Sequence, residues 1–214
     1  MNKKIIWKME YSITCLIAFA IVLLCLPTSF IKSKEAMFIS KWNDIFKDVS
    51  YAFEVMDARG NDGLVKGLTS SNSLNKRKQS MMTLIKPYLR IKAEDEFQNK
   101  NYVVHYLDKS LVKPQDKFYF NKLYLTSDNM IVGIKDLNNT DNLKPMFIMM
   151  FDLNGRRGPN TWGKDIYGIN VYIDGDVTSI GYGWDLKNIK KDCSIKGTGV
   201  ACSHYYRIGG NFSE

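Results

Sequence analysis

The order of apolar and polar residues divides the chain into an apolar segment, an amphipathic segment and a series of short alternating runs. Residues 11–31 contain no charged side chain. A helix of this length spans about 31 Å, close to the thickness of the hydrocarbon core of a bilayer. The lysines at positions 3, 4 and 8 favour a cytoplasmic N-terminus. The pattern predicts a basic cytoplasmic leader at 1–10 and a single transmembrane segment at 11–31. A cleaved secretory signal is the alternative, but residues 25–30 offer no convincing cleavage site.

The segment that follows is amphipathic. Its apolar residues recur every three or four positions and form one stripe, at Phe38, Trp42, Ile45, Val49, Ala52 and Met56. This spacing places them on one face of a helix, and the charged residues between them fall elsewhere. We therefore expect one long helix from about residue 6 to about residue 56. Its amphipathic continuation, residues 32–58, contributes to the core of a folded domain.

The remaining residues, 59–214, are predicted to form one extracytoplasmic domain. A short helix is expected over 75–86, ending near Pro87. Strand-like runs follow at Tyr102–Leu107, Lys117–Leu125, Met130–Lys135, Pro145–Asp152, Gly168–Ile173 and Val177–Tyr182. Helices first and strands afterwards indicate an α+β fold, with the long helix packed on an antiparallel sheet.

Two N-terminal residues carry a resemblance to a known family. Glu10 lies near the start of the apolar segment, and Pro27 follows seventeen positions later. This spacing, with a long helix that precedes a sheet, resembles type IV pilins and the pseudopilins of type II secretion. The resemblance implies that Glu10 pairs with the N-terminal amine of a neighbouring subunit and that apolar helices pack side by side during assembly.

The resemblance also implies cleavage just before Ile6, if Glu10 takes the family's fifth mature position. The chain carries Ile5 where the family's peptidase expects glycine, and Lys8 replaces an apolar residue. A divergent or unprocessed pilin-like protein is therefore one alternative. An interfacial Glu10 without a partner is another.

The net charge of +8 raises the question of nucleic-acid binding. The lysines are scattered, however, and the densest cluster is only the three residues 76–78. A solvated basic surface that favours anionic lipid headgroups or an acidic partner explains the charge better. We expect membrane lipid and other pilin-like subunits as partners, and no nucleic acid.

The four cysteines lie in two settings. Cys15 and Cys25 belong to the apolar segment, where a thiol behaves as a small hydrophobic group. Cys193 and Cys202 are nine positions apart in a polar stretch. We expect these two to form a disulfide in an oxidising compartment, and two free thiols in a reduced protein are the alternative.

The loop at 152–165 is the best candidate for a metal site. It is rich in glycine and offers four side-chain oxygen donors, at Asp152, Asn154, Asn160 and Asp165. Oxygen donors and a flexible backbone suit Ca²⁺, although the full EF-hand pattern is absent. Some pseudopilins bind calcium in a loop at a comparable place. An ordinary turn held by Asx hydrogen bonds is the alternative, and the positive charge of Arg156 and Arg157 favours it.

Motifs for catalysis are missing from the sequence. It contains no G-x-S-x-G, no P-loop and no H-E-x-x-H, and its only histidines are His105 and His204. We predict a non-enzymatic pilin-like or pseudopilin-like subunit of a cell-envelope filament or secretion apparatus. The alternative is a membrane-anchored extracytoplasmic binding protein that does not polymerise.

Overall fold

The computed structural model describes residues 3–59, 83–92, 102–139, 141 and 143–211. Within the first helix, the side chains of 3–10, 22–32 and 57–59 lie outside this description. The chain separates into two compact units, Met1–Met37 and Phe38–Glu214.

Helix α1 extends over Lys3–Arg59 and supplies residues to both units. In the first unit, every side chain from 11 to 21 is exposed. Over the part of the chain that can be described, no helix has both the length and the apolar character needed to cross a membrane. In the predicted transmembrane segment, the side chains of residues 22–31, including Pro27, lie outside the described part of the structure. The side chain of Glu10 also lies outside it.

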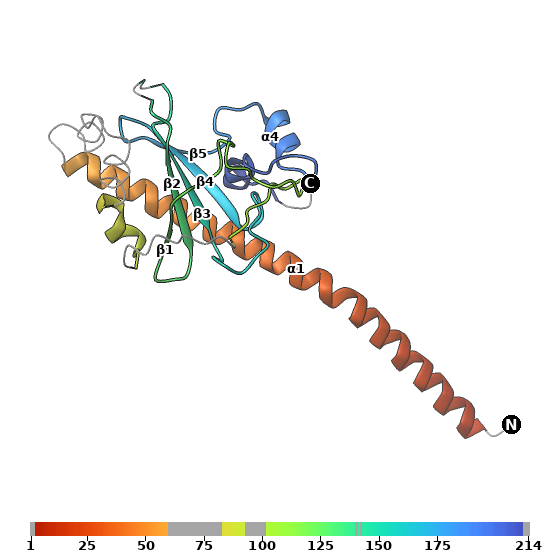
Figure 1. Cartoon of the computed structure of the whole chain (residues 1–214). Coiled ribbons are helices and arrows are strands. Elements are labelled where there is room, and N and C mark those ends of the chain that lie inside the picture. The colour runs from red at the N-terminus through yellow and green to blue at the C-terminus, as the bar shows by residue number, and fades with distance from the viewer. Residues whose placement is uncertain (1–2, 60–82, 93–101, 140, 142, 212–214) are drawn as a thin grey trace. The chain divides into compact units, whose positions relative to one another are not determined.

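The second unit is built on a five-stranded antiparallel sheet in which neighbours in sequence are neighbours in space (Figure 1). The predicted α+β class with an antiparallel sheet is therefore confirmed. The strands are β1 Leu123–Leu125, β2 Ile131–Asp136, β3 Phe147–Asp152, β4 Ile166–Val171 and β5 Val177–Ser179. The central strand β3 is buried along its whole length, which explains why nearly all of its residues are apolar.

One face of the sheet packs on the amphipathic part of α1. Trp42 is fully buried there and stacks on Tyr167 of β4, with ring centroids 5.2 Å apart. Its Nε1 atom donates a hydrogen bond of 2.8 Å to the carbonyl of Ser203. The predicted stripe is buried at Trp42, Val49, Ala52 and Met56 and half-buried at Phe38 and Ile45. The buried face is wider than predicted, because Phe46 and Phe53 also join the core.

The other face of the sheet is covered by residues 102–120, which lie outside the strands of the sheet. Alternating residues of the sheet, such as Ile131, Ile148 and Ile166, pack on this segment. The predicted strand at 102–107 is therefore wrong, and only the last three residues of the run 117–125 form a strand, β1. Residues 102–107 do alternate between apolar and polar side chains. Their backbone, however, forms hydrogen bonds with loops and not with a neighbouring strand of the sheet.

The C-terminal segment packs on the α1 side of the sheet. It contains α4 (Leu186–Asp192), α5 (Cys202–Tyr205) and a 3₁₀ turn, η1 (Tyr206–Ile208). A disulfide joins Cys193 to Cys202, as the sequence predicted. The Ser203 hydroxyl accepts a hydrogen bond of 2.9 Å from the backbone N–H of Gly168 in β4. The segment is thereby fixed to both α1 and the sheet.

The predicted helix at 75–86 lies partly outside the described residues. Its described part, residues 83–89, is helical and continues past Pro87. Ile85 and Leu89 are buried in the core that α1 shares with the sheet. The helix therefore ends later than the proline suggested, because its apolar face has a core to pack on.

We expect Trp42→Ala to lower the free energy of unfolding of the second unit by about 3–5 kcal/mol, because it removes a buried aromatic side chain and its hydrogen bond. Denaturant unfolding of the full-length chain in mild detergent measures the change. Tyr51→Ala is the matched control, since Tyr51 lies on the same helix and is 65% exposed. An equal loss in both variants would contradict the packing.

Candidate functional site

The connection between β3 and β4 holds the four residues predicted as metal ligands. Asp152 is the last residue of β3, and Asp165 directly precedes β4. Asp152 pairs with Ile166 across the two strands, and the backbone N–H of Leu153 donates a 2.9 Å hydrogen bond to the Asp165 carbonyl. The ladder between β3 and β4 therefore brings the two carboxylates together at the base of the loop.

Asp152 is held by three hydrogen bonds. Its Oδ1 atom accepts from the backbone N–H groups of Asn154, at 3.2 Å, and Gly155, at 2.9 Å. Its Oδ2 atom accepts from the hydroxyl of Tyr102 at 2.5 Å. The two backbone bonds are those of an Asx turn, so the structural alternative that the sequence left open is present here.

Asp165 organises the opposite side of the loop. Its Oδ1 atom accepts from the backbone N–H of Thr161 at 2.7 Å, and Oδ2 accepts from that of Asn160 at 2.9 Å. Asn160 itself adopts a left-handed conformation, with φ of 47°. The carboxylate therefore fixes a backbone turn that few non-glycine residues adopt without support.

Both carboxyl groups are fully buried, and this raises their pKa values. Burial followed by repulsion from Asp165 raises the pKa of Asp152 to about 7. Burial also raises the pKa of Asp165. Neither carboxylate has an ion-pair partner within the described part of the chain. Near neutral pH the pair therefore carries negative charge that only hydrogen bonds offset.

Two amide oxygens at the same loop also have no partner. The Oδ1 atoms of Asn154 and Asn160 are buried and accept no hydrogen bond from any residue in the described part of the chain. Each belongs to a residue whose backbone N–H is bonded to one of the carboxylates. A buried polar atom without a partner costs about 1–3 kcal/mol, so these oxygens call for a donor or a cation.

The types of oxygen donor at this loop suit a hard cation. Two carboxylates and two amide oxygens are the ligand types that Ca²⁺ prefers, and the two negative charges match its own charge. Among the described residues, no group of three or more His, Cys, Asp or Glu side chains lies close enough together to hold a metal ion. A cation at this loop would therefore need the amide oxygens as ligands in addition to the two carboxylates. Arg156 and Arg157, which favoured a plain turn, are both exposed, in contrast to the buried carboxylates.

Sequence reasoning missed two residues that complete the surroundings of the loop. Tyr102 carries the hydroxyl that bonds Asp152, and it is fifty positions away in sequence. Lys41, on α1, donates from Nζ to the carbonyl of Leu153 at 2.5 Å. Neither contact has a signal in local spacing, because both depend on how distant segments fold together.

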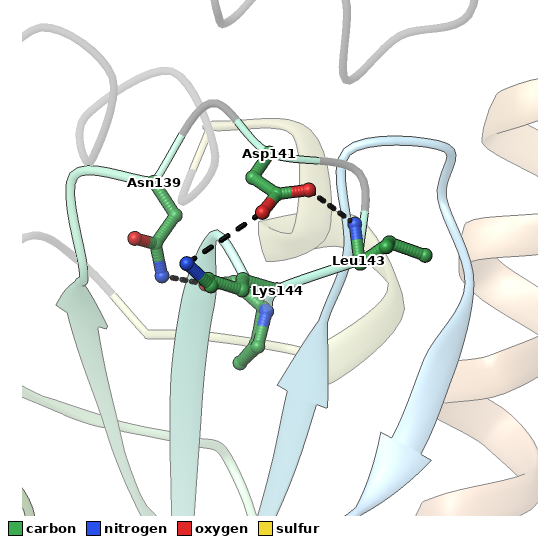
Figure 2. Close-up of polar contacts among 5 residues, drawn as sticks. Asn139, Asp141, Leu143 and Lys144 are labelled. Carbon is green, nitrogen blue, oxygen red and sulfur yellow. Dashed lines mark hydrogen bonds and ion pairs between the residues drawn. The ribbon is translucent and has the colours of Figure 1, made fainter.

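Other polar clusters serve local structure. At the turn between β2 and β3, Asn139 donates to the Pro145 carbonyl and Asp141 accepts from the Leu143 N–H, both at 2.9 Å (Figure 2). Asp141 also pairs with Lys144 at 3.6 Å, but both side chains are about half exposed or more. Such exposed pairs contribute little, and here they close the turn.

The two histidines take separate positions. His204 bonds to the Ser179 hydroxyl through Nδ1 at 2.9 Å, and burial lowers its pKa. His105 lies in the segment that covers the sheet, where its backbone bridges to Thr161. The two histidines therefore lie in different parts of the domain, and Cys202, two positions before His204, forms the disulfide with Cys193.

Comparison with known proteins adds no assignment. The chain matches no protein-family model, no curated protein and no solved structure.

The buried carboxylates predict a stability that falls with rising pH when divalent cations are chelated. The native pKa of Asp152 lies above its unfolded value, so its contribution is fully present below about pH 4 and is lost as the pH rises through about 7. The slope is about 1.4 kcal/mol per pH unit at most.

Thermal unfolding with a chelator at several pH values measures this dependence. Asp152→Asn, which cannot ionise, should flatten the curve relative to the native chain. Asp128→Asn removes an exposed carboxylate and is the matched control. Parallel curves for the native chain and Asp152→Asn would show that Asp152 does not titrate in this range.

Proposed function

We propose that this chain is a non-enzymatic pilin-like or pseudopilin-like subunit of a cell-envelope filament or secretion apparatus. In this proposal the N-terminal helix anchors the chain in the membrane as a single span. The folded domain stays outside the cytoplasm. Assembly occurs through the N-terminal helices, and the domains remain on the outside.

The observation that carries the proposal is the contrast between the two parts of α1. The side chains from 42 to 56 form the buried face that supports the sheet. From 11 to 21 the helix exposes its side chains all round, including Leu16 at 68% and Phe19 at 63%. An uncharged helical surface of this kind needs lipid or other apolar helices around it. Both are available to a membrane-anchored subunit that assembles.

Three further features support the same proposal. The helix precedes an antiparallel sheet and contributes to its core, which is the order of elements in the family that the sequence resembles. The disulfide suits an oxidising compartment outside the cytoplasm. The spacing of Glu10 and Pro27 supplies the residues that the resemblance links to assembly.

Replacement of Glu10 tests assembly directly. If Glu10 pairs with a neighbouring N-terminal amine, Glu10→Gln should reduce the assembled fraction at least tenfold, because a neutral amide loses the charge attraction. The assembled fraction is measured by cross-linking through the exposed thiol of Cys15 in isolated envelopes, followed by sizing in mild detergent. Glu54→Gln is the control, since this exposed carboxylate lies in the part of α1 that belongs to the folded domain.

The N-terminus of the isolated protein separates this proposal from its alternative. A mature chain that begins at Ile6 with a methylated amine supports a pilin-like subunit. An intact Met1 together with a monomer in mild detergent would contradict it. That outcome would favour an anchored extracytoplasmic binding protein that does not polymerise.

We further propose that the loop at 152–165 binds calcium. The unpartnered amide oxygens of Asn154 and Asn160, beside two buried carboxylates, carry this proposal. Asp152, Asn154, Asn160 and Asp165 would hold the ion. A bound cation would neutralise the repulsion between the carboxylates and satisfy the amide oxygens, so its role would be to stabilise the domain.

Calcium should therefore raise the melting temperature of the full-length chain in mild detergent. At a hundredfold excess over the dissociation constant the gain is about 2.7 kcal/mol, or roughly 5–10 °C for a domain of this size. Asp165→Asn should abolish the rise and Asn154→Ala should reduce it. Asp128→Asn should leave it unchanged. Equal melting temperatures in excess calcium and excess chelator would falsify the calcium site.

A further inference from the structure

The disulfide closes a loop that a single carboxylate organises from within. Asp192, the last residue of α4, accepts three hydrogen bonds from this loop. Its Oδ1 atom accepts from the backbone N–H and the hydroxyl of Thr198, at 3.1 and 2.6 Å, and Oδ2 accepts from the N–H of Ala201 at 2.8 Å. The Asp192 carbonyl also accepts from the N–H of Gly199 at 3.0 Å. The disulfide and Asp192 together define one backbone conformation for 193–202, which we call the cystine loop.

The cystine loop packs directly on the candidate calcium loop. Gly163 and Gly199 face each other with no room for a side chain on either. A Cβ atom on Gly163 would lie 2.7 Å from the Sγ of Cys202, and one on Gly199 would lie 2.4 Å from the carbonyl oxygen of Trp162. The buried hydroxyl of Tyr206 also donates to the Gly163 carbonyl at 3.1 Å. Movement of one loop therefore requires movement of the other.

Residues 102–108 connect the same two loops by a second route. At one end, the backbone N–H groups of Leu107 and Asp108 donate to the cystine loop, at the carbonyls of Thr198 and Gly197, over 3.0 and 2.9 Å. Closer to the calcium loop, the backbone N–H of His105 donates to the Asn160 carbonyl at 3.0 Å. The His105 carbonyl accepts from the backbone N–H of Trp162, also at 3.0 Å.

The segment then reaches the proposed ligands themselves. The Asn160 side chain donates to the carbonyl of Val103 at 3.4 Å. The hydroxyl of Tyr102 donates to Asp152. A shift of residues 102–108 would therefore move the groups that hydrogen-bond Asn160 and Asp152. Hydrogen bonds to the cystine loop fix residues 102–108 in place.

We propose that the Cys193–Cys202 disulfide sets the calcium affinity of the loop at 152–165. This inference rests on the proposed calcium site and assigns its regulation. The intact disulfide holds residues 102–108 and Gly163 in place, so the oxygen donors are arranged before the ion arrives. When the disulfide is opened, the cystine loop loses its covalent closure and is held by hydrogen bonds alone, to Asp192 and to residues 107–108. The calcium loop then loses a fixed support on two sides.

Thermodynamic linkage makes the effect reciprocal. If the disulfide strengthens calcium binding by a given factor, bound calcium favours the disulfide over the two thiols by the same factor. Dithiothreitol reduces the cystine to two thiols and is itself oxidised to its cyclic disulfide. Calcium should therefore shift the reduction equilibrium of this one bond.

Calcium titration of the full-length chain in mild detergent tests the proposal. We expect the variant that carries both Cys193→Ser and Cys202→Ser to bind calcium at least tenfold more weakly than the native chain. Val49→Ala is the matched control, because it destabilises the core at a buried residue of α1 and leaves the disulfide intact. It should bind calcium as the native chain does, and an equal weakening in this control would overturn the proposal.

The outcomes separate this inference from the site on which it rests. Equal affinities in the native chain and the double serine variant would overturn the role of the disulfide and leave the calcium site standing. Absence of binding in the native chain would overturn both. If the double variant does not fold, the reduction equilibrium of the native chain decides. A dithiothreitol dependence that is identical in excess calcium and in excess chelator would overturn the coupling.

Discussion

The buried central strand β3 is the constraint on which the second unit depends. All six of its residues are buried, so both faces of the sheet must be covered. The amphipathic part of α1 covers one face, and residues 102–120 cover the other. Each layer comes from a different part of the chain, and neither is formed by the sheet itself. The domain is therefore a three-layer arrangement in which the amphipathic part of α1 is one structural layer.

The burial of β3 also determines the chemistry at its end. Because the strand stays buried up to its last residue, Asp152 places a carboxylate in the interior, and the antiparallel register brings Asp165 next to it. Two carboxyl groups that share a buried site repel one another, which contributes to the raised pKa of Asp152. The loop hydrogen bonds offset part of this cost. The buried Oδ1 atoms of Asn154 and Asn160 accept no hydrogen bond from the described residues.

The C-terminal segment ties these layers together. Ser203 accepts the Trp42 indole N–H through its carbonyl and the Gly168 N–H through its hydroxyl, so α1, α5 and β4 meet at one residue. The neighbouring Cys202 is linked to the end of α4 and lies against Gly163 of the β3–β4 loop. The cystine loop and the residue that follows it therefore contact both the first helix and the loop of the candidate site.

The sequence by itself determined the features that depend on local periodicity and residue chemistry. The stripe from Trp42 to Met56, the strands β2 to β4 and the disulfide partners follow from spacing along the chain. Only the tertiary structure decided that residues 102–107 form a cover and not a strand, since apolar alternation is equally compatible with both. It also decided that Tyr102 and Lys41 contact the loop. The loop buries two carboxylates beside two amide oxygens that accept no hydrogen bond from the described residues. These features depend on contacts between segments tens of residues or more apart, and periodicity within a short window carries no information about such contacts.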